Sequence, residues 1–223
     1  MIVVVGSRHD RVARSLVEAL PTAALCGAED LSRPGWLWPV ASPEPARWVV
    51  DGRVVDDHEV TGVLVRRTHV YPEELVSTHP DDRAYLAAES TAFLIFVLSR
   101  TVARVVNPVA AGALGDEAIR PERWMPLATA AGLRPAPLRL RPSVMPRASR
   151  KPSTVEVVGG TAFGTAPPRL RVGATALAAA LQIAYAAFVF DGRGRLVTVS
   201  SAHPPGRAAR RVLASLLAKR SGG

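Results

Sequence analysis

The sequence contains a single cysteine, Cys26, among its 223 residues, and only 5% of the residues are aromatic. One cysteine cannot form an internal disulfide bond, which excludes a disulfide-stapled secreted scaffold and favours a reducing compartment. The hydrophobic fraction is nevertheless 48%, so the chain has enough apolar side chain to bury a core. We therefore expect a folded cytoplasmic protein.

Carboxylates are nearly absent from the C-terminal half. Residues 123–223 contain 16 lysine and arginine residues but only two carboxylates, Glu156 and Asp191, which gives a net charge of +14. Residues 1–122 contain 12 cations and 17 carboxylates, a net charge of −5. The basic half predicts an anionic partner, which can be nucleic acid, a membrane surface, or an acidic peptide or protein. It cannot by itself supply the acidic ligands of a metal site.

Targeting and membrane-spanning segments are also missing. The apolar run at residues 2–5 lacks the basic leader and the cleavage site of a signal peptide. Residues 172–190 contain no charge, but they are rich in alanine and include Gln182, so a helix followed by a strand explains them better than a membrane span. We expect no membrane partner.

The first 140 residues alternate between strand and helix patterns. We expect strands at 2–5, 23–26, 63–65 and 102–106, a hairpin of 48–50 with 53–55 around Asp51-Gly52, and helices at 10–20, 80–100 and 121–131. Asp10 is a plausible N-cap of the first helix. This alternation predicts an α/β domain with a mostly parallel sheet over residues 1–140.

The rest of the chain has a different character. Residues 141–171 predict a basic, proline-rich connection that holds one hairpin, of 155–158 with 161–165. Residues 172–223 predict a small α+β lobe, with a helix at 173–181, strands at 183–190 and 195–200 around the turn 191–194, and a closing helix at 205–219.

Few residues indicate a binding site or a metal site. Arg66 and Arg67 end a predicted buried strand, where α/β sheets bind ligands; a surface salt bridge to the acidic half is the alternative. Trp36 and Trp38 are either half-buried packing residues or an exposed anchor for a partner. The donor cluster at residues 56–59 follows a hairpin, where polar residues are expected anyway, and the histidines share no ligand spacing, so we predict no metal site.

A series of weak motifs, in a fixed order, resembles a known family. The motifs are Leu64-Val65-Arg66-Arg67, Ala87-Ala88-Glu89, Val105-Val106-Asn107-Pro108, and the segment Leu127 to Pro135 with its Ala-Ala-Gly-Leu core. They resemble the N-terminal lobe of ATP-grasp ligases, especially the graspetide (microviridin-type) ligases that crosslink ribosomally made precursor peptides. Residues 175–204 resemble the last segment of that family. The resemblance implies a pre-ATP-grasp-like N-terminal domain and covers about two thirds of the chain.

The departures from the family are as informative as the matches. Pro121 stands near the place of the family's nucleotide-binding lysine, and fewer than forty residues separate Pro135 from the closing lobe, so the central ATP-grasp lobe should be missing. Thr198 and Ser200 stand where the family offers a glutamate and an asparagine to magnesium. Phosphoryl transfer depends on such cations and metal ions. We therefore expect a pseudoenzyme without a cofactor.

The truncated pattern resembles the peptide-binding helper proteins of crocagin-type natural-product pathways. The resemblance implies a non-catalytic protein that holds a precursor peptide and presents it to a modifying enzyme. The opposite charges of the two halves, and strand edges that no central lobe covers, predict a homodimer. The candidate peptide-binding residues are Arg66, Arg67, Arg141, Arg147, Arg150 and Lys151. The alternatives are a nucleic-acid-binding module, which the pI of about 11.0 favours but the absence of a recognition motif opposes, and a residual ATP-grasp-type ligase.

Overall fold

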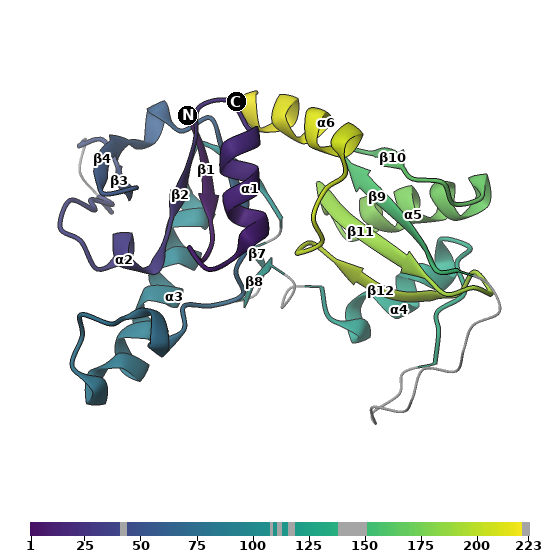
Figure 1. Ribbon diagram of the computed structural model, residues 1–223, viewed down its shortest axis with the longest axis horizontal. Helices are drawn as coiled ribbons and strands as arrows, with labels where there is room; N and C mark the ends of the chain where they lie inside the picture. Colours follow the sequence, from purple (N-terminus) through teal and green to yellow (C-terminus); the bar gives the residue numbers. More distant parts are fainter. Residues whose placement is uncertain (41–43, 108, 111–112, 116–118, 138–150, 220–223) are drawn as a thin grey trace. The chain divides into compact units, whose positions relative to one another are not determined.

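The computed structural model describes residues 1–40, 44–107, 109–110, 113–115, 119–137 and 151–219 (Figure 1). The chain forms two compact units, which are described separately. Unit 1 comprises Met1–Ala118 together with Ala214–Gly223, and unit 2 comprises Ile119–Leu213. The predicted domain boundaries at residues 140 and 171 stay predictions. Within the described ranges, every helix is too short or too polar to cross a membrane.

A four-stranded parallel sheet forms the centre of unit 1. Its strands are β1 (Ile2–Val5), β2 (Ala23–Cys26), β5 (Gly62–Val65) and β6 (Arg104–Val106), in the order β2-β1-β5-β6. Strand β1 lies between β2 and β5, because Ile2 pairs with both Ala23 and Gly62. Every residue of β1 and β5 is buried, as expected for β-branched runs in a parallel sheet. The sheet confirms the predicted α/β architecture.

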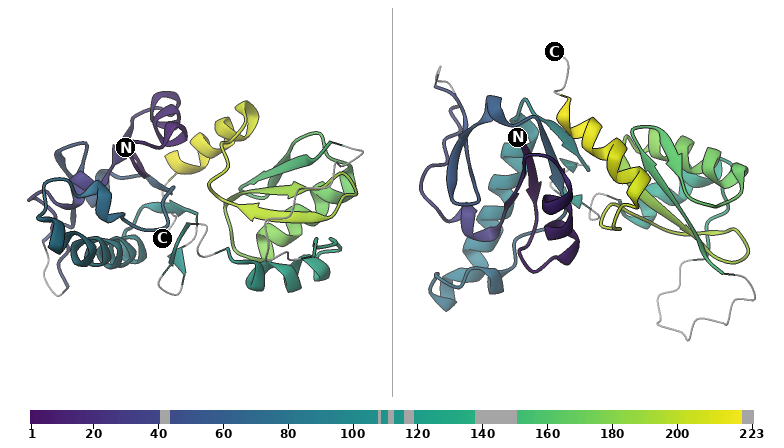
Figure 2. Two further views of the ribbon diagram at one scale, coloured as in Figure 1. Left: turned by 60° about the horizontal axis from the view of Figure 1, so that its bottom comes forward. Right: turned by 45° about the horizontal axis from the view of Figure 1, so that its top comes forward.

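Helices cover both faces of this sheet. Helix α1 (Arg11–Ala19) begins at the predicted N-cap, where Oδ1 of Asp10 accepts the N–H of Val12 at 2.8 Å. Helix α3 (Arg83–Arg100) follows the 3₁₀ turn η3 (Pro80–Asp82) and packs Leu94 and Val97 in one core cluster with alternate residues of β1 and β5. The views in Figure 2 show α1 and α3 on opposite faces of the sheet.

The predicted hairpin is present as β3 (Arg47–Val50) and β4 (Arg53–Asp56). Asp51 and Gly52 both have positive φ, 50° and 71°, which is the conformation of a tight two-residue turn that an Asp-Gly pair favours. Trp36 lies half-buried with its ring 5.6 Å from that of Trp48 and 5.1 Å from that of Phe93. This arrangement supports the packing interpretation of the tryptophans.

Several short elements of unit 1 were not predicted. They are α2 (Ala28–Leu31), the 3₁₀ turns η1 (Asp57–Glu59) and η2 (Pro72–Glu74), and the strands β7 (Val109–Ala110) and β8 (Ala113–Leu114). These short elements contain neither a β-branched run nor a turn motif such as Asp-Gly, which revealed the other short strands, so the sequence pattern does not indicate them.

Unit 2 is a four-stranded antiparallel sheet with helices on one face. Its strands are β9 (Ser153–Val158), β10 (Thr161–Phe163), β11 (Tyr185–Phe190) and β12 (Leu196–Ser200), in the order β10-β9-β11-β12. Helices α4 (Pro121–Ala130) and α5 (Pro168–Ala180) contribute Trp124, Leu170 and Leu177 to a core cluster with Phe188 and Phe190. The predicted strands at 183–190 and 195–200 are present as β11 and β12, and the predicted hairpin of 155–158 with 161–165 is present as β9 and β10. Strand β9 of this hairpin pairs with β11 in the same sheet.

Two details of unit 2 depend on local chemistry. Helix α5 begins at Pro168, earlier than the predicted start at residue 173, because proline is well suited to the first helical position. The predicted turn at 191–194 is confirmed. Burial acts to raise the pKa of the Asp191 carboxyl, but hydrogen bonds from Arg195 and Arg193 and the charge of Arg195 outweigh it and lower the pKa below its usual value of 3.8. The charged carboxylate therefore stabilises the turn.

Helix α6 (Arg207–Ala218) closes the chain and contributes its last residues to unit 1. Leu217 is fully buried there, and its backbone lies against Gly62 in β5. A Cβ atom on Gly62 would lie 2.4 Å from the carbonyl oxygen of Leu217, which is closer than real Cβ atoms approach. The absence of a side chain at Gly62 therefore allows α6 to pack on the sheet.

We predict that Gly62→Ala lowers the free energy of unfolding by about 1–3 kcal/mol, because the added methyl group overpacks the contact with the α6 backbone. Hydrogen–deuterium exchange should also become faster across residues 214–219. Gly132→Ala is the matched control: Gly132 has a φ of 73°, and a Cβ atom added there would meet nothing within 4 Å, so it should cost about 1 kcal/mol without changing exchange in α6. Unchanged exchange in α6 of Gly62→Ala would contradict the packing argument.

Candidate functional site

The carboxyl edge of the parallel sheet in unit 1 is the natural place for a site. The chain runs from β1 to β2 on one side and then returns to form β5 on the other side of β1. Ligands of open α/β sheets bind outside the carboxyl ends of the strands near such a reversal of strand order. Gly27, Gly6, Arg66 and Asn107 follow β2, β1, β5 and β6 at this edge.

Arg66 and Arg67 stand where the sequence predicts, directly after β5, but their side chains are only 4% and 3% exposed. Nε of Arg66 donates a hydrogen bond to Oδ2 of Asp10 at 2.9 Å. Nη2 of Arg67 donates to Oε2 of Glu74 at 2.5 Å. The pairs are therefore buried rather than on the surface, and removing one partner would leave an uncompensated buried charge.

Asn107 fixes the end of the neighbouring strand. Its Nδ2 donates a hydrogen bond to the carbonyl oxygen of Val65 at 2.8 Å, and its φ is 76°. Asparagine tolerates this left-handed conformation better than most residues. Asn107 thus connects β6 to β5 just before Arg66. The Asn-Pro pair was noted in the sequence, but the hydrogen bond of Asn107 to β5 was not predicted. Its acceptor is a backbone carbonyl group, which every residue has, so no residue type indicates it.

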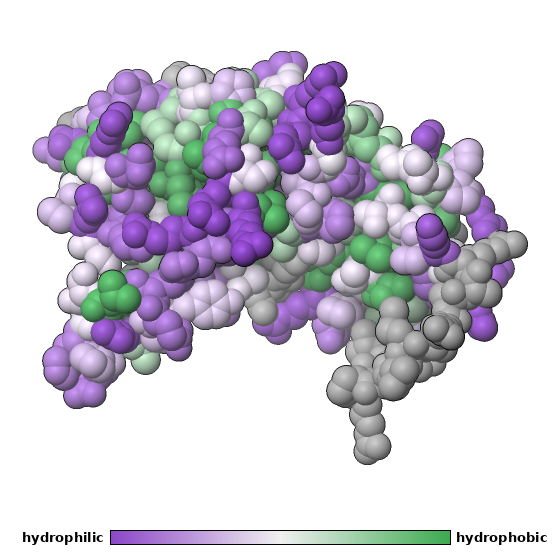
Figure 3. Space-filling view, in the orientation of Figure 1, coloured by the Kyte–Doolittle hydropathy of each residue, from purple (hydrophilic) through white to green (hydrophobic). Residues whose placement is uncertain are grey.

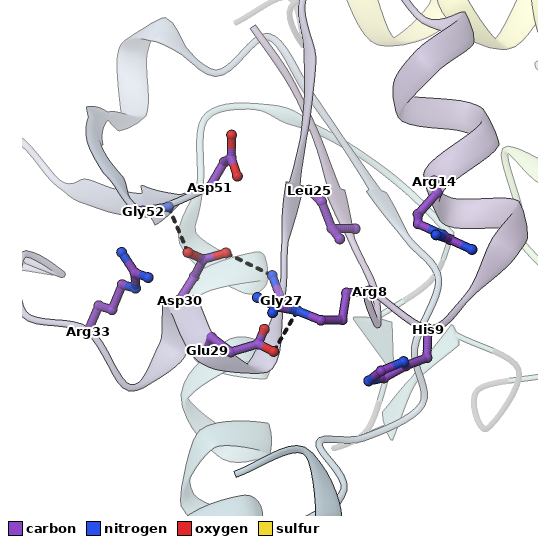
Figure 4. A pocket seen from close by; sticks show the side chains of 10 residues that line it. All are labelled: Arg8, His9, Arg14, Leu25, Gly27, Glu29, Asp30, Arg33, Asp51 and Gly52. Atoms are coloured by element: carbon purple, nitrogen blue, oxygen red, sulfur yellow. Dashed lines mark hydrogen bonds and ion pairs between the residues drawn. The ribbon is translucent and has the colours of Figure 1, made fainter. Parts of the chain in front are cut away.

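A pocket of about 540 Å³ opens beside the ends of β1 and β2 (Figure 4). Its wall includes Arg8 and His9 from the β1–α1 loop, Arg14 from α1, Arg33 beyond α2, and Leu25 from β2. The carboxylates of Glu29, Asp30 and Asp51 also line it. Hydrophilic side chains gather on this face of unit 1, over α1 and the loop before it (Figure 3). The pocket therefore combines charges of both signs.

The buried carboxylate of Asp30 assembles one side of the pocket. Its Oδ2 accepts the backbone N–H of Gly27 at 2.9 Å, and its Oδ1 accepts the N–H of Gly52 at 2.9 Å. Asp30 thereby ties the end of β2 to the turn of the β3–β4 hairpin. Nε of Arg8 forms an ion pair with Oε1 of Glu29 at 2.6 Å, on the same side of the pocket.

The pocket residues were missed at the level of sequence. A signal was present: Arg8 and His9 directly follow a predicted strand, as Arg66 and Arg67 do. Ligands of α/β sheets bind outside the carboxyl ends of the strands, and this rule applies to the Arg8-His9 pair as well as to the Arg66-Arg67 pair. Arg14, Arg33 and Asp51 come from three other elements, and only the fold brings them together.

The other candidate residues belong to unit 2 or lie outside the described residues. Lys151 is exposed and precedes β9, whereas Arg141, Arg147 and Arg150 fall in the range that the structure does not describe. Both edges of the antiparallel sheet are short. Leu196 at the β12 edge pairs with Pro135, and β10 forms the other edge.

Neither the cluster of polar side chains at residues 56–59 nor Cys26 is arranged for metal binding or thiol chemistry. Among the described residues no group of three histidine, cysteine or acidic side chains could hold a metal ion. Asp57 of the donor cluster is buried, and its carboxylate accepts hydrogen bonds from Trp48 Nε1 at 2.7 Å and Thr101 Oγ1 at 2.6 Å. Burial, with a smaller contribution from Asp30, raises the pKa of the Cys26 thiol strongly, so it is not a reactive thiolate.

The fold of this chain is similar to the folds of RiPP-associated ATP-grasp ligases and macrocyclases among the solved structures. No family model matches the chain, and no curated protein matches its sequence. Among solved structures, the macrocyclase MdnC bound with precursor peptide MdnA, from Microcystis aeruginosa MRC, aligns with a TM-score of 0.73 at 10% identity. That alignment covers 97% of this chain and 98% of MdnC.

Two further structures give the same result. A RiPP-associated ATP-grasp ligase from Chryseobacterium gregarium, in complex with ADP and with a leader and core peptide, has a TM-score of 0.67 at 9% identity and covers 97% of this chain and 96% of its own. The macrocyclase MdnB from Microcystis aeruginosa MRC aligns with a TM-score of 0.61 at 15% identity, and the alignment covers 97% of this chain and 98% of MdnB. Identities this low show the fold alone. The resemblance to peptide-crosslinking ATP-grasp ligases is confirmed at that level.

We predict that Asp30→Ala lowers the free energy of unfolding of unit 1 by about 2–4 kcal/mol, because two backbone N–H groups lose their acceptor. Urea unfolding followed by tryptophan fluorescence measures this change, since Trp36, Trp38 and Trp48 all belong to unit 1. Asp81→Ala is the control: its side chain is 88% exposed, so it should cost less than about 0.5 kcal/mol. Equal stability of the two variants would show that the Asp30 hydrogen bonds do not hold the hairpin.

Proposed function

We propose that this chain is a non-catalytic peptide-binding protein of RiPP biosynthesis, which holds a ribosomally made precursor peptide and presents it to a modifying enzyme. The observation that carries the proposal is the shared fold, over 97% of the chain, with a ligase solved in complex with its precursor peptide. A peptide is therefore the first partner to consider. The buried thiol of Cys26 suits a protein of the reducing cytoplasm.

The residues of unit 2 support a loss of catalysis. Thr198 and Ser200 lie on β12, where the resemblance places the magnesium ligands of an active ligase. Neutral hydroxyl groups are weaker ligands for magnesium than carboxylates. Pro121, near the place of the nucleotide-binding lysine, is the first residue of α4 and carries no positive charge. In this proposal the central ATP-grasp lobe is missing, and the chain keeps the flanking parts of the fold.

The basic half of the chain supplies the attraction for a peptide. Residues 123–223 carry a net charge of +14, and Lys151 exposes its side chain next to β9. A bound peptide could add to the sheet edge at β10 or β12, where backbone hydrogen bonds give affinity and side-chain pockets give selectivity. Micromolar affinity needs about 8 kcal/mol, which exposed charge pairs of at most about 1 kcal/mol each do not reach alone.

Each group of candidate arginines has its own role in this proposal. Arg141, Arg147 and Arg150, with Lys151, would attract the carboxylates of the peptide. Arg66 and Arg67 are buried in ion pairs with Asp10 and Glu74, which favours a positioning role at the end of β5. A homodimer is the proposed assembly, because oppositely charged halves and exposed strand edges both promote self-association.

A nucleic-acid-binding module is the second candidate function, favoured by the pI of about 11.0. The dependence of affinity on salt concentration distinguishes peptide binding from nucleic-acid binding. Affinity for nucleic acid falls steeply with salt because counterions are released, whereas peptide binding along a sheet edge keeps a salt-resistant backbone and apolar part.

We predict that replacing Arg147, Arg150 and Lys151 by glutamate weakens binding of the cognate precursor peptide by about tenfold or more at low salt, and by less at high salt, because screening reduces the charge contribution. Fluorescence anisotropy with labelled peptide measures both affinities. The matched control replaces Arg169, Arg171 and Arg193, exposed cations of unit 2, by glutamate, which gives the same change in net charge. If both variants bind the peptide equally, net charge and not the basic connection determines binding.

We also predict that the protein binds ATP with magnesium only weakly, with a Kd above about 1 mM, because Thr198 and Ser200 offer magnesium no carboxylate. Isothermal titration calorimetry measures this directly. Micromolar binding of ATP would restore the ligase interpretation.

A further inference from the structure

Helix α3 of unit 1 carries very few charges for a helix at the surface. Only three of its 18 residues, Arg83, Glu89 and Arg100, are charged. Its inner side packs on the parallel sheet through residues such as Leu94 and Val97. A surface helix normally presents charged and polar side chains to water, and a helix that is apolar all round is normally covered on every side. The outer face of α3 thus has the composition of a surface that another molecule covers.

One uncharged stripe runs along this outer face. Its members recur at spacings of three and four residues, which places them on one side of the helix: Tyr85, Ala88, Ala92, Phe96 and Ser99. Phe96 is half-buried and the other four are exposed, Tyr85 to 71%. Val102, just beyond the end of α3, is 60% exposed. The left view of Figure 2 shows α3 at the outer side of unit 1, away from α1, where a partner can reach it.

Two exposed charges flank the stripe, Glu89 in its first half and Arg100 at its end. Neither forms an ion pair with any residue that the structure describes, although the guanidinium of Arg100 lies 5.8 Å from the centre of the Phe96 ring. Eleven residues are close to three helical turns, so both charges lie on the same flank, about 16 Å apart along the axis. A complementary partner therefore offers a cation near Glu89 and a carboxylate near Arg100.

A second copy of α3, packed antiparallel about a two-fold axis, has this charge pattern. In such a pair the same surface of both copies is used, and residues at equal distances from the axis face each other. The midpoint of Glu89 and Arg100 lies between residues 94 and 95. The midpoint of Ala92 and Phe96 is residue 94. One axis therefore brings both pairs together, and the small side chain of Ala92 leaves room for the Phe96 ring.

The exposed apolar side chains at the two ends of α3 fit the same axis. The midpoint of Tyr85 and Val102 lies between residues 93 and 94, so the aromatic ring at one end of the helix meets the aliphatic side chain at the other end of the second copy. Tyrosine combines a large apolar ring with a hydroxyl group that can remain in water, which suits the rim of an interface. Charge, ring and aliphatic pairs thus agree on one register.

We propose that the outer face of α3 is the interface of a symmetric homodimer, in which the α3 helices of two copies pack antiparallel about an axis near residue 94. The proposal rests on the homodimer of the proposed function and names the surface that forms it. A single pair of helices buries less than the roughly 1,600 Å² of a standard interface, so we expect a Kd of about 10 µM.

The first test places a charge in the middle of the interface. Ala92 is exposed and glutamate is a good helix former, so Ala92→Glu should keep the fold of the chain. Sedimentation equilibrium of the full-length protein should give a dimer Kd of about 10 µM for the unmodified chain and a Kd at least about tenfold higher for this variant. Ala176→Glu is the matched control, at an exposed position of α5 in unit 2, and should leave the Kd unchanged.

The second test exchanges the charges that flank the stripe. Glu89→Arg and Arg100→Glu should each raise the dimer Kd about tenfold, because like charges then face each other twice across the axis. The double variant should dimerise as the unmodified chain does. An equimolar mixture of the two single variants should form a heterodimer, since every charge then faces one of opposite sign. This rescue shows that the single variants are folded.

Each alternative result contradicts the proposal in its own way. A monomer at about 200 µM overturns the interface and the homodimer together. A dimer that Ala92→Glu leaves unchanged, or a mixture of single variants that associates no better than either one alone, overturns the interface only. Assembly beyond the dimer also contradicts it, because a two-fold interface is closed.

Peptide binding is tested separately. The basic connection and the antiparallel sheet belong to unit 2, whereas α3 belongs to unit 1. The variant Ala92→Glu should therefore bind the precursor peptide as tightly as the unmodified chain does in the anisotropy experiment. A protein that dimerises through α3 but binds no peptide would overturn the proposed function and leave this interface in place.

Discussion

The buried carboxylate of Asp30 is the interaction on which the candidate site of unit 1 depends. A parallel sheet ends in loops, and these loops need a common anchor if they are to form a defined surface. Asp30 supplies it by accepting one N–H from the end of β2 and one from the turn of the β3–β4 hairpin. Carboxylates that accept backbone N–H groups make strong, charge-assisted hydrogen bonds. The hairpin is thereby held at the edge of the sheet, and Asp51 and Arg33 are held with it.

The charges of this edge serve two different purposes. Arg66 and Arg67 have lost almost all contact with water, and their ion pairs with Asp10 and Glu74 fix the chain that leaves β5. Arg14 and Arg33 remain exposed, so their guanidinium groups stay available to a molecule from solution. Burial, and not residue type, separates an arginine that organises the fold from one that can recognise a partner.

The sequence predicted the framework better than the site. Continuous β-branched runs revealed β1 and β5, the Asp-Gly pair revealed the hairpin, and Asp10 revealed the start of α1, because each signal is local. The Asp30 hydrogen bonds, the burial of Arg66 and Arg67, and the pocket depend on residues brought together from separate elements. The likeness of the fold to these ligases was also predicted, from the order of weak motifs along the chain, although the identity to MdnC is only 10%.

The packing of Leu217 on Gly62 joins α6 to the parallel sheet of unit 1. Unit 1 is not a continuous stretch of sequence, since Ala214–Gly223 completes what Met1–Ala118 begins. During synthesis on a ribosome, the face of β5 at Gly62 therefore stays uncovered until α6 has been translated. A chain that stops before α6 keeps an open sheet surface that chaperones and proteases can recognise.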